Sequence, residues 1–340
     1  MKSPFKFLDA YSKDDKEIFF GREKEIEEIY ERLFKGNLIL IYGASGTGKT
    51  SILNCGIANR FQESDWFPVN VRRRNNLLDS VRKEIDKLAL TPISTDKSLC
   101  DAFHSLYLDF FKPIYVIFDQ FEELFISGSP DEQQKFLEFL TELLARGYNI
   151  KVIITIREEY LAHFSEFEEH IPNFFDNRYR VEHMTPAKAE EVITKSCRNF
   201  NIEISEPRKV SKEIIKNISA EDAYRVELTY LQVYLDRMFQ QYLKNNQPPV
   251  VFTNQLLDEV GDIKDVLSVF LEEQIAKVEE PELAWTILKA FITSGGTKKT
   301  TSMESIKKYL EENNKPISQE KIESYLRQFF NLKIIKYIDE

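Results

Sequence analysis

A chain of 340 residues with 42% hydrophobic content can bury a full α/β core and still supply one or two smaller domains. The formal net charge of −10 gives no overall attraction for nucleic acid, which is therefore not an expected partner. Cys55, Cys100 and Cys197 lie far apart and predict neither a disulfide framework nor a zinc site. The sequence shows no signal-peptide core and no apolar run of membrane-spanning length, so we expect a cytoplasmic protein with no membrane partner.

The first 36 residues predict an aromatic lead followed by a charged amphipathic helix. This helix begins at the sequence FFGRE, residues 19–23, and carries apolar residues along one face. By composition alone, Gly21 and Arg22 belong to the start of a helix. An aromatic residue and a flexible turn at this place could also cover a purine.

Residues 37–51 are the most informative part of the chain. A run of β-forming residues, Leu38 to Tyr42, leads directly into the sequence GASGTGKTS. Glycines let the backbone N–H groups of such a loop turn inward around a polyphosphate, while the lysine reaches the β and γ phosphates and the threonine hydroxyl meets Mg²⁺. The candidate binding residues are Gly43, Ala44, Ser45, Gly46, Thr47, Gly48, Lys49, Thr50 and Ser51.

After this loop, strand and helix patterns alternate. We expect a helix to about residue 61, a strand over 67–71, a helix over 77–88 and strands over 113–118, 151–156 and 178–183. The runs 113–118 and 151–156 are short and β-branched, as is typical of buried parallel strands. Thr185 and Pro186 predict the start of the next helix. Residues 1–186 therefore predict an α/β domain with a doubly wound parallel sheet of five strands.

The remaining residues predict two further domains. Residues 187–278 show only helical periodicity, with helices over about 226–242 and 263–277. Residues 279–340 predict a winged-helix-like domain, with helices over 282–291, 302–312 and 318–330, a Gly295–Gly296 turn and a strand over 332–338. A wing needs a second strand, so we expect either a fragment of a longer protein or an edge that is capped in another way.

Acidic residues follow the strand over 113–118. Asp119 ends this strand at the edge of the phosphate-binding loop, where a carboxylate holds the shell of Mg²⁺ through water; otherwise it would cap a helix. Glu122 and Glu123 follow, and either could polarise the water that attacks the γ-phosphate, or both could form a solvated acidic face. Because Gln120 stands directly after Asp119, we expect the base to be displaced or weakened and hydrolysis to be slow.

Arg157 ends the strand over 151–156 and could reach the γ-phosphate, which would distinguish ATP from ADP. The alternative is an ion pair with Glu158 or Glu159. The triplet at 72–74, three arginines after the second strand, is interpreted as an exposed basic loop outside the site.

These segments together resemble the novel STAND NTPases, a bacterial group within the STAND class of signal-transduction ATPases. The motifs SPFKFLDAY, FFGRE, YGASGTGKTS, IFDQFEELF and TIREEYL occur in the order and approximate spacing of that group, and the resemblance covers nearly the whole chain. It implies that Gly21 and Arg22 lie beside the adenine. The family commonly has a nucleotide-contacting proline in its helical domain, and Thr229 stands at that place here.

The resemblance implies an ATP-dependent switch that binds ATP or ADP with Mg²⁺ and controls self-association. Sensor and effector domains, through which protein partners would act, are not visible in these residues. The runner-up is a DNA-binding ATPase like the archaeal origin initiators. The candidate recognition helix opposes Lys321 and Arg327 with Glu320 and Glu323, which is a poor balance for binding a phosphate backbone. A third interpretation, a small-molecule kinase, would need an arginine lid and an acceptor pocket.

Overall fold

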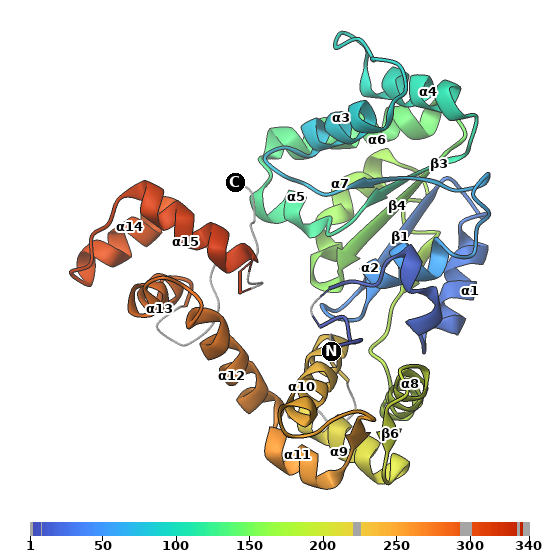
Figure 1. Ribbon diagram of the computed structural model, residues 1–340. Helices are drawn as coiled ribbons and strands as arrows, with labels where there is room; N and C mark the ends of the chain where they lie inside the picture. The colour runs from blue at the N-terminus through green and yellow to red at the C-terminus, as the bar shows by residue number, and fades with distance from the viewer. Residues whose placement is uncertain (1–2, 8, 220–225, 293–300, 332–333, 336–340) are drawn as a thin grey trace. The chain divides into compact units, whose positions relative to one another are not determined.

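The computed structural model describes residues 3–7, 9–219, 226–292, 301–331 and 334–335. The chain divides into two compact units, one within residues 1–259 and the other within residues 260–338. Figure 1 shows the order of the elements along the chain. The division into three domains at 187 and 279 stays a prediction.

A five-stranded parallel sheet forms the centre of the first unit, and it confirms the predicted fold class. The strands lie in the order β2-β3-β4-β1-β5. Their bounds are β1 Leu38–Gly43, β2 Phe67–Val71, β3 Ile114–Phe118, β4 Ile150–Arg157 and β5 Arg178–Arg180. Gly43 pairs with Arg157, and Val71 pairs with Phe118. This register brings the loops that follow β1, β2, β3 and β4 to one edge of the sheet.

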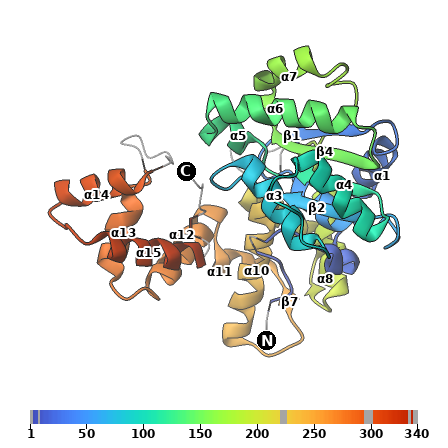
Figure 2. The same cartoon turned by 90° about the horizontal axis from the view of Figure 1, so that it is seen from above.

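Alternating side chains on the strands build a core on each face of the sheet. On β3, Val116 and Phe118 pack with the helices of one face, whereas Tyr115 and Ile117 pack with those of the other. The first face is covered by α3 (Leu77–Leu88), α4 (Leu99–Phe110), α5 (Glu122–Ser127), α6 (Pro130–Ala145), η3 (Glu158–Phe164) and α7 (Ser165–His170). The second face is covered by α1 (Glu23–Arg32) and η2 (Ile52–Ile57). Figure 2 shows α6 and α7 side by side from above.

Several helical segments of this unit differ from the sequence interpretation. The helix after the phosphate-binding loop starts as α2 (Lys49–Ser51), continues as the π-helix η2 and ends at Ile57, short of residue 61. The helices α4, α6 and α7 and the 3₁₀ helices η1 (Lys13–Ile18) and η3 were not predicted. The spacing of the buried Ala102, Phe103 and Leu106 in α4 is helical, so this helix was overlooked and not hidden by its composition.

The helical segment of the first unit contains a small sheet, so the expectation of helix alone was wrong. Its helices are α8 (Pro186–Asn199), α9 (Pro207–Ile218), α10 (Leu228–Asn245) and α11 (Asn254–Val260). Between them, β6 (Glu203–Ile204) pairs in parallel with β7 (Val251–Phe252). Two-residue strands are too short to leave a period of two in the sequence. The ring of Phe5 packs between Phe200 and Phe239, at 5.6 and 6.5 Å, and joins the N-terminal lead to this segment.

The second unit is a small helical assembly. Its helices are α12 (Ile263–Ile275), α13 (Pro281–Lys289), α14 (Met303–Glu312) and α15 (Gln319–Asn331), and Ile287, Leu310 and Phe329 lie in their common core. The Gly295–Gly296 turn and most of the strand expected over 332–338 fall outside the described residues, so the winged helix stays a prediction. Among the residues described, we find no helix with the length and apolarity needed to cross a membrane.

Candidate nucleotide-binding site

The loop after β1 has a backbone that only glycine fits at two of its positions. Gly43 has φ +154°, and a Cβ there would lie 2.4 Å from the Val181 carbonyl oxygen. Gly46 has φ +76°, and a Cβ there would lie 2.7 Å from Glu227 Oε2. Gly48, also at positive φ, then begins the helix of Lys49 and Thr50. The structure therefore forms the turn that the sequence predicts for cradling a polyphosphate.

Lys49 lies inside the mouth of this loop. Its Nζ donates hydrogen bonds to the carbonyl oxygens of Gly43 and Ala44, both at 2.8 Å. Burial lowers the pKa of Lys49, while the carboxylates of Glu122 and Asp119 act in the opposite direction. An ammonium group in this position has lost part of its hydration and has acidic side chains as its neighbours. The negative charge of a phosphate would stabilise this partly desolvated ammonium group.

Asp119 receives donors from three elements at the sheet edge. Thr155 on β4 donates to Oδ1 at 2.7 Å, and Thr50 contacts both oxygens at 3.0 and 3.1 Å. Arg72, which follows β2, donates to Oδ2. Gln120, the next residue, has φ +60°, and its backbone N–H donates to Thr155 Oγ1 at 3.1 Å. The sequence predicts Asp119 at the edge of the phosphate-binding loop, and there it contacts Thr50, whereas its contacts with Thr155 and Arg72 were not predicted.

The Thr50 hydroxyl and the Asp119 carboxylate are the hard oxygen donors that Mg²⁺ prefers, and the structure places them in direct contact. No group of three His, Cys, Asp or Glu side chains capable of holding a metal occurs in the part of the chain that the structure describes. Magnesium here would therefore take its other ligands from water and phosphate, as Mg²⁺ sites at nucleotides usually do. The residues fit such an ion.

Glu122 and Arg157 form a pair beside the phosphate-binding loop. The Glu122 side chain is 3% exposed, and its Oε1 lies 3.0 Å from Arg157 Nε. Its Oε2 accepts a hydrogen bond from the Arg157 backbone N–H at 3.2 Å. Of the two partners expected as alternatives for Arg157, Glu158 pairs with Arg180 instead, at 2.8 Å.

Glu123 differs from Glu122 although the two are adjacent. Among the described residues, its buried Oε2 has no hydrogen-bond partner. Burial raises the pKa of Glu123, and the charge of Glu122 raises it further. Glu122, by contrast, acts on Lys49 and holds Arg157. The geometry therefore associates Glu122, more than Glu123, with the phosphate-binding loop.

The buried side chain of Arg22 connects two backbone segments. It is 3% exposed, and its Nη2 donates to the carbonyl oxygens of Thr47 at 2.8 Å and Glu182 at 3.1 Å. A Cβ at Gly21, which has φ +86°, would lie 2.4 Å from Val192. The contacts of Arg22 hold the phosphate-binding loop in position. The placement of Gly21 and Arg22 beside an adenine stays a prediction.

The first residues of α10 lie against the phosphate-binding loop. Thr229 Oγ1 would be 3.8 Å from a Cβ at Gly46, and Leu228 would be 3.6 Å from a Cβ at Gly48. Glu227 also lies near His183, with 3.9 Å between Oε1 and Nδ1. Thr229, at the position where the family commonly has proline, therefore lies near the loop, whereas neither Glu227 nor His183 was predicted there.

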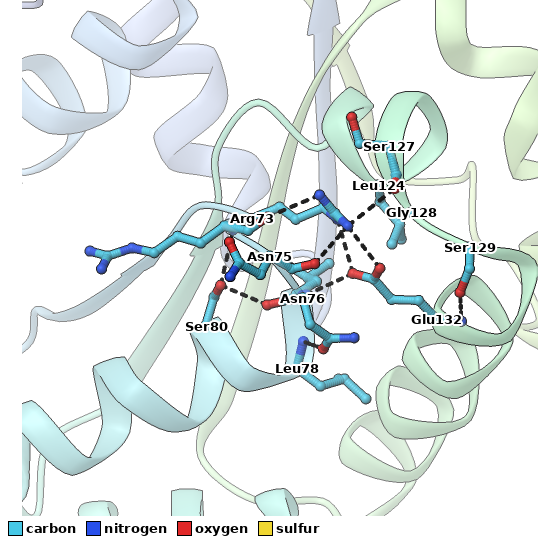
Figure 3. A network of polar contacts seen from close by, with 12 residues as sticks. Arg73, Asn75, Asn76, Leu78, Ser80, Leu124, Ser127, Gly128, Ser129 and Glu132 are labelled. Atoms are coloured by element: carbon cyan, nitrogen blue, oxygen red, sulfur yellow. Dashed lines mark hydrogen bonds and ion pairs between the residues drawn. The ribbon is translucent and has the colours of Figure 1, made fainter. Parts of the chain in front are cut away.

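The arginines after β2 form the exposed basic loop that the sequence predicted only in part, since Arg72 and Arg74 are exposed and Arg73 is not. Arg73 is 5% exposed and makes a two-point ion pair with the equally buried Glu132, with both N···O distances at 3.0 Å. Figure 3 shows this network, in which Arg73 also donates to the carbonyl oxygens of Asn75 and Ser127. Glu132, which lies in α6, accepts the Leu77 backbone N–H as well. The prediction was wrong for Arg73 because the buried partner lies 59 residues away along the chain.

Comparisons with known proteins agree with this fold. The family model described as Novel STAND NTPase 1 matches residues 4–337. A Walker-type ATPase of Pyrococcus abyssi is 17% identical, with 96% of this chain and 93% of that chain covered and a TM-score of 0.51. The ORC2 protein of Aeropyrum pernix in ADPNP and ADP complexes is 16% identical, with coverages of 93% and 87% and a TM-score of 0.54. The ORC1 protein of the same organism in complex with DNA is 13% identical, with coverages of 94% and 85% and a TM-score of 0.53.

At these identities the structural likeness establishes the fold alone. Comparison of the sequence with curated proteins gives no match.

Proposed function

Because the chain belongs to the Novel STAND NTPase 1 family, and is thus a P-loop NTPase, we propose that it is a switch whose state depends on whether ATP or ADP is bound. In this proposal ATP hydrolysis is slow, and the ATP-bound form self-associates and binds protein partners. We also place the protein in the cytoplasm, with which its three free, buried cysteines are compatible.

The Glu122–Arg157 ion pair is the observation that carries this proposal. A nucleotide can shift an equilibrium only if it interacts differently with the two states, and the γ-phosphate is the group by which ATP and ADP differ. Arg157 ends β4 opposite Gly43, the first residue of the loop, and its side chain is 44% exposed. It is therefore free to exchange a carboxylate partner for a phosphate.

Each site residue has a role in this proposal. The backbone from Gly43 to Ser51 and the Lys49 ammonium bind the phosphates, while Thr50 and Asp119 hold Mg²⁺, which would neutralise phosphate charge. Glu122 orients Arg157 and the attacking water, and Arg157 senses the terminal phosphate. Thr229 and Glu227 at the start of α10 transmit the change, because they lie on the loop itself.

The proposal is tested with Arg157→Ala and a matched control, Arg180→Ala, which removes a neighbouring arginine that pairs with Glu158. Calorimetry measures affinity for ADP and for a non-hydrolysable ATP analogue, and analytical ultracentrifugation measures the assembly state with each. We expect Arg157→Ala to bring the two affinities together and to abolish any ATP-specific assembly, with Arg180→Ala like the wild type. Retained discrimination in Arg157→Ala would overturn the proposal.

A DNA-binding ATPase is the alternative. In α15, Lys321 lies 2.6 Å from Glu280, and Arg327 lies 3.6 Å from Glu323, so both cations of the candidate recognition helix have acidic neighbours. Paired cations release few counterions from DNA, which supports the switch over this alternative. Fluorescence anisotropy with a labelled duplex decides between them: submicromolar binding with a steep salt dependence would favour the alternative.

A further inference from the structure

Arg72 is the one arginine of its triplet that reaches the candidate metal-binding carboxylate. Its Nη2 lies 2.5 Å and its Nε 3.1 Å from Asp119 Oδ2. The two side chains differ in freedom, since that of Arg72 is 55% exposed and that of Asp119 only 10%. The carboxylate is therefore fixed, whereas the guanidinium is able to move.

The Asp119 carboxylate has no acceptor site to spare. Oδ1 accepts from Thr155 at 2.7 Å and from the single Thr50 hydroxyl proton at 3.0 Å, which Oδ2 shares at 3.1 Å, and Oδ2 accepts both the Nε–H and an Nη2–H of Arg72. A carboxylate offers about four lone-pair sites in all. The hydrogen bond from Thr155 to Oδ1 is buried, and the Thr50 oxygen would itself be a ligand of the cation. The water shell of a divalent cation and the guanidinium of Arg72 therefore need the same oxygen, Oδ2.

The backbone at Arg72 is held on both sides. Before it, Val71 pairs with Phe118 and accepts the Asp119 backbone N–H at 3.0 Å. After it, Arg73 is fixed by the buried ion pair with Glu132 shown in Figure 3. Arg72 is thus kept within reach of Asp119, and only its side chain can respond to a change at the carboxylate.

There is room for that response beside the carboxylate. A cavity of about 390 Å³ is lined by Arg72 and Asp119 together with the polar Asn54, Asn70, Ser80 and Glu84 and the cationic Lys83 and Arg74. Since a water molecule takes up roughly 30 Å³ of liquid, the cavity can receive a displaced guanidinium and several waters. Glu84 and the two asparagines give it polar groups that can accept the guanidinium hydrogen bonds.

We propose that Arg72 competes with the divalent cation for Asp119 and so sets how tightly the nucleotide-loaded site holds its metal. This inference rests on the proposed nucleotide function. Metal binding is weakened because the guanidinium must leave Asp119 before the water shell of the cation can form. Removing the guanidinium by mutation should therefore strengthen metal binding. A merely structural arginine would have the opposite effect, because its loss would leave Asp119 less well positioned.

The test uses the full chain loaded with ADP and Mn²⁺ as the probe, with free Mn²⁺ followed by electron paramagnetic resonance. Arg72→Ala is compared with Arg74→Ala, which removes the same charge from the same cavity without touching Asp119. We expect the half-saturating Mn²⁺ concentration to fall roughly tenfold in Arg72→Ala, a coupling within the usual range, and to stay close to wild type in Arg74→Ala. Affinity for ADP in EDTA should be unchanged in both variants, and thermal unfolding checks their folding.

An unchanged or higher half-saturating concentration in Arg72→Ala, with normal ADP binding, would overturn this inference alone. An equal fall in Arg74→Ala would also overturn it, because long-range charge would then explain the result. If the wild type bound no ADP, the proposed function would fail and this inference with it.

Discussion

The loops that follow β1 and β2 lie at the same edge of the sheet, but their structures are determined differently. The loop after β1 is specified by its backbone, with positive φ at Gly46 and Gly48. The loop after β2 is specified by side-chain partners 47 and 59 residues away, Asp119 for Arg72 and Glu132 for Arg73. A local conformation is visible in the sequence as glycine spacing, whereas a distant pairing is not. Under the proposals above, the first loop binds phosphate, and the second contributes stability through Arg73 and adjusts metal affinity through Arg72.

The largest effect that we expect is on stability, and it tests whether side-chain partners hold the loop after β2. We expect Arg73→Ala to lower the free energy of unfolding by about 3–5 kcal/mol, because it leaves Glu132 as an unpaired buried charge. Arg74→Ala, its exposed neighbour, should change it by less than about 0.5 kcal/mol. Urea denaturation of both variants provides the measurement. If the two variants were equally stable, the ion pair in Figure 3 would not be the anchor of this loop.

Lys49→Ala should show the opposite signature in the loop after β1. We expect ATP affinity to fall roughly a hundredfold, or about 3 kcal/mol, because a charge-assisted contact to phosphate is lost. The free energy of unfolding should stay within about 1 kcal/mol of the wild type, since the lost hydrogen bonds to the loop are offset by removal of a partly desolvated charge. Calorimetry with Lys87→Ala, an exposed lysine of α3, is the control. Unchanged ATP affinity would contradict the assignment of the site.

The loop after β3 depends both on a special backbone conformation, at Gln120, and on a distant side-chain partner, Arg157 for Glu122. Its two glutamates provide the next test. We expect Glu122→Gln to reduce single-turnover ATP hydrolysis roughly a hundredfold, the lower end of general-base effects. The reason is its contact with Arg157 and its charge beside Lys49. Glu123→Gln should stay near the wild-type rate. Loss of turnover in Glu123→Gln alone would assign the base to that residue.

The sheet could be predicted from the sequence because each buried strand is a short β-branched run. β2 has the predicted bounds of 67–71, and β3 and β4 begin or end within one residue of those expected. Helix α4 was missed, and the pair β6 and β7 was too short to leave a pattern. Local signals were sufficient for the buried strands of the central sheet and insufficient for elements too short to show a period, whereas the regular helices α4 and α6 were overlooked.

The candidate site divides in the same way. The closeness of Thr50 and Asp119 agrees with the motifs, because Thr50 follows β1 and Asp119 follows β3, and the carboxyl ends of these parallel strands lie at one edge of the sheet with β4 between them. Thr155, Arg72 and Glu227 could not be predicted, since each depends on register or on the packing of a helix far along the chain. The buried Arg73 was misassigned because three consecutive arginines are usually solvated.

The smallest expected effect concerns the charge of Glu123, whose pKa is raised by burial and by the neighbouring Glu122. A carboxyl group with a raised pKa in the folded state favours folding fully at pH values below its unfolded pKa, and this contribution is lost as the pH rises through the folded pKa. Glu123→Gln removes the titration. It should therefore match the wild type near pH 4 and become more stable as the pH rises to 8. The gain should stay under about 1 kcal/mol, because the side chain is partly exposed and solvent screens it. Urea denaturation across this pH range measures the difference, with Glu169→Gln at an exposed position as the control. A gain in stability that does not vary with pH would show that the substitution acts through packing and not through charge.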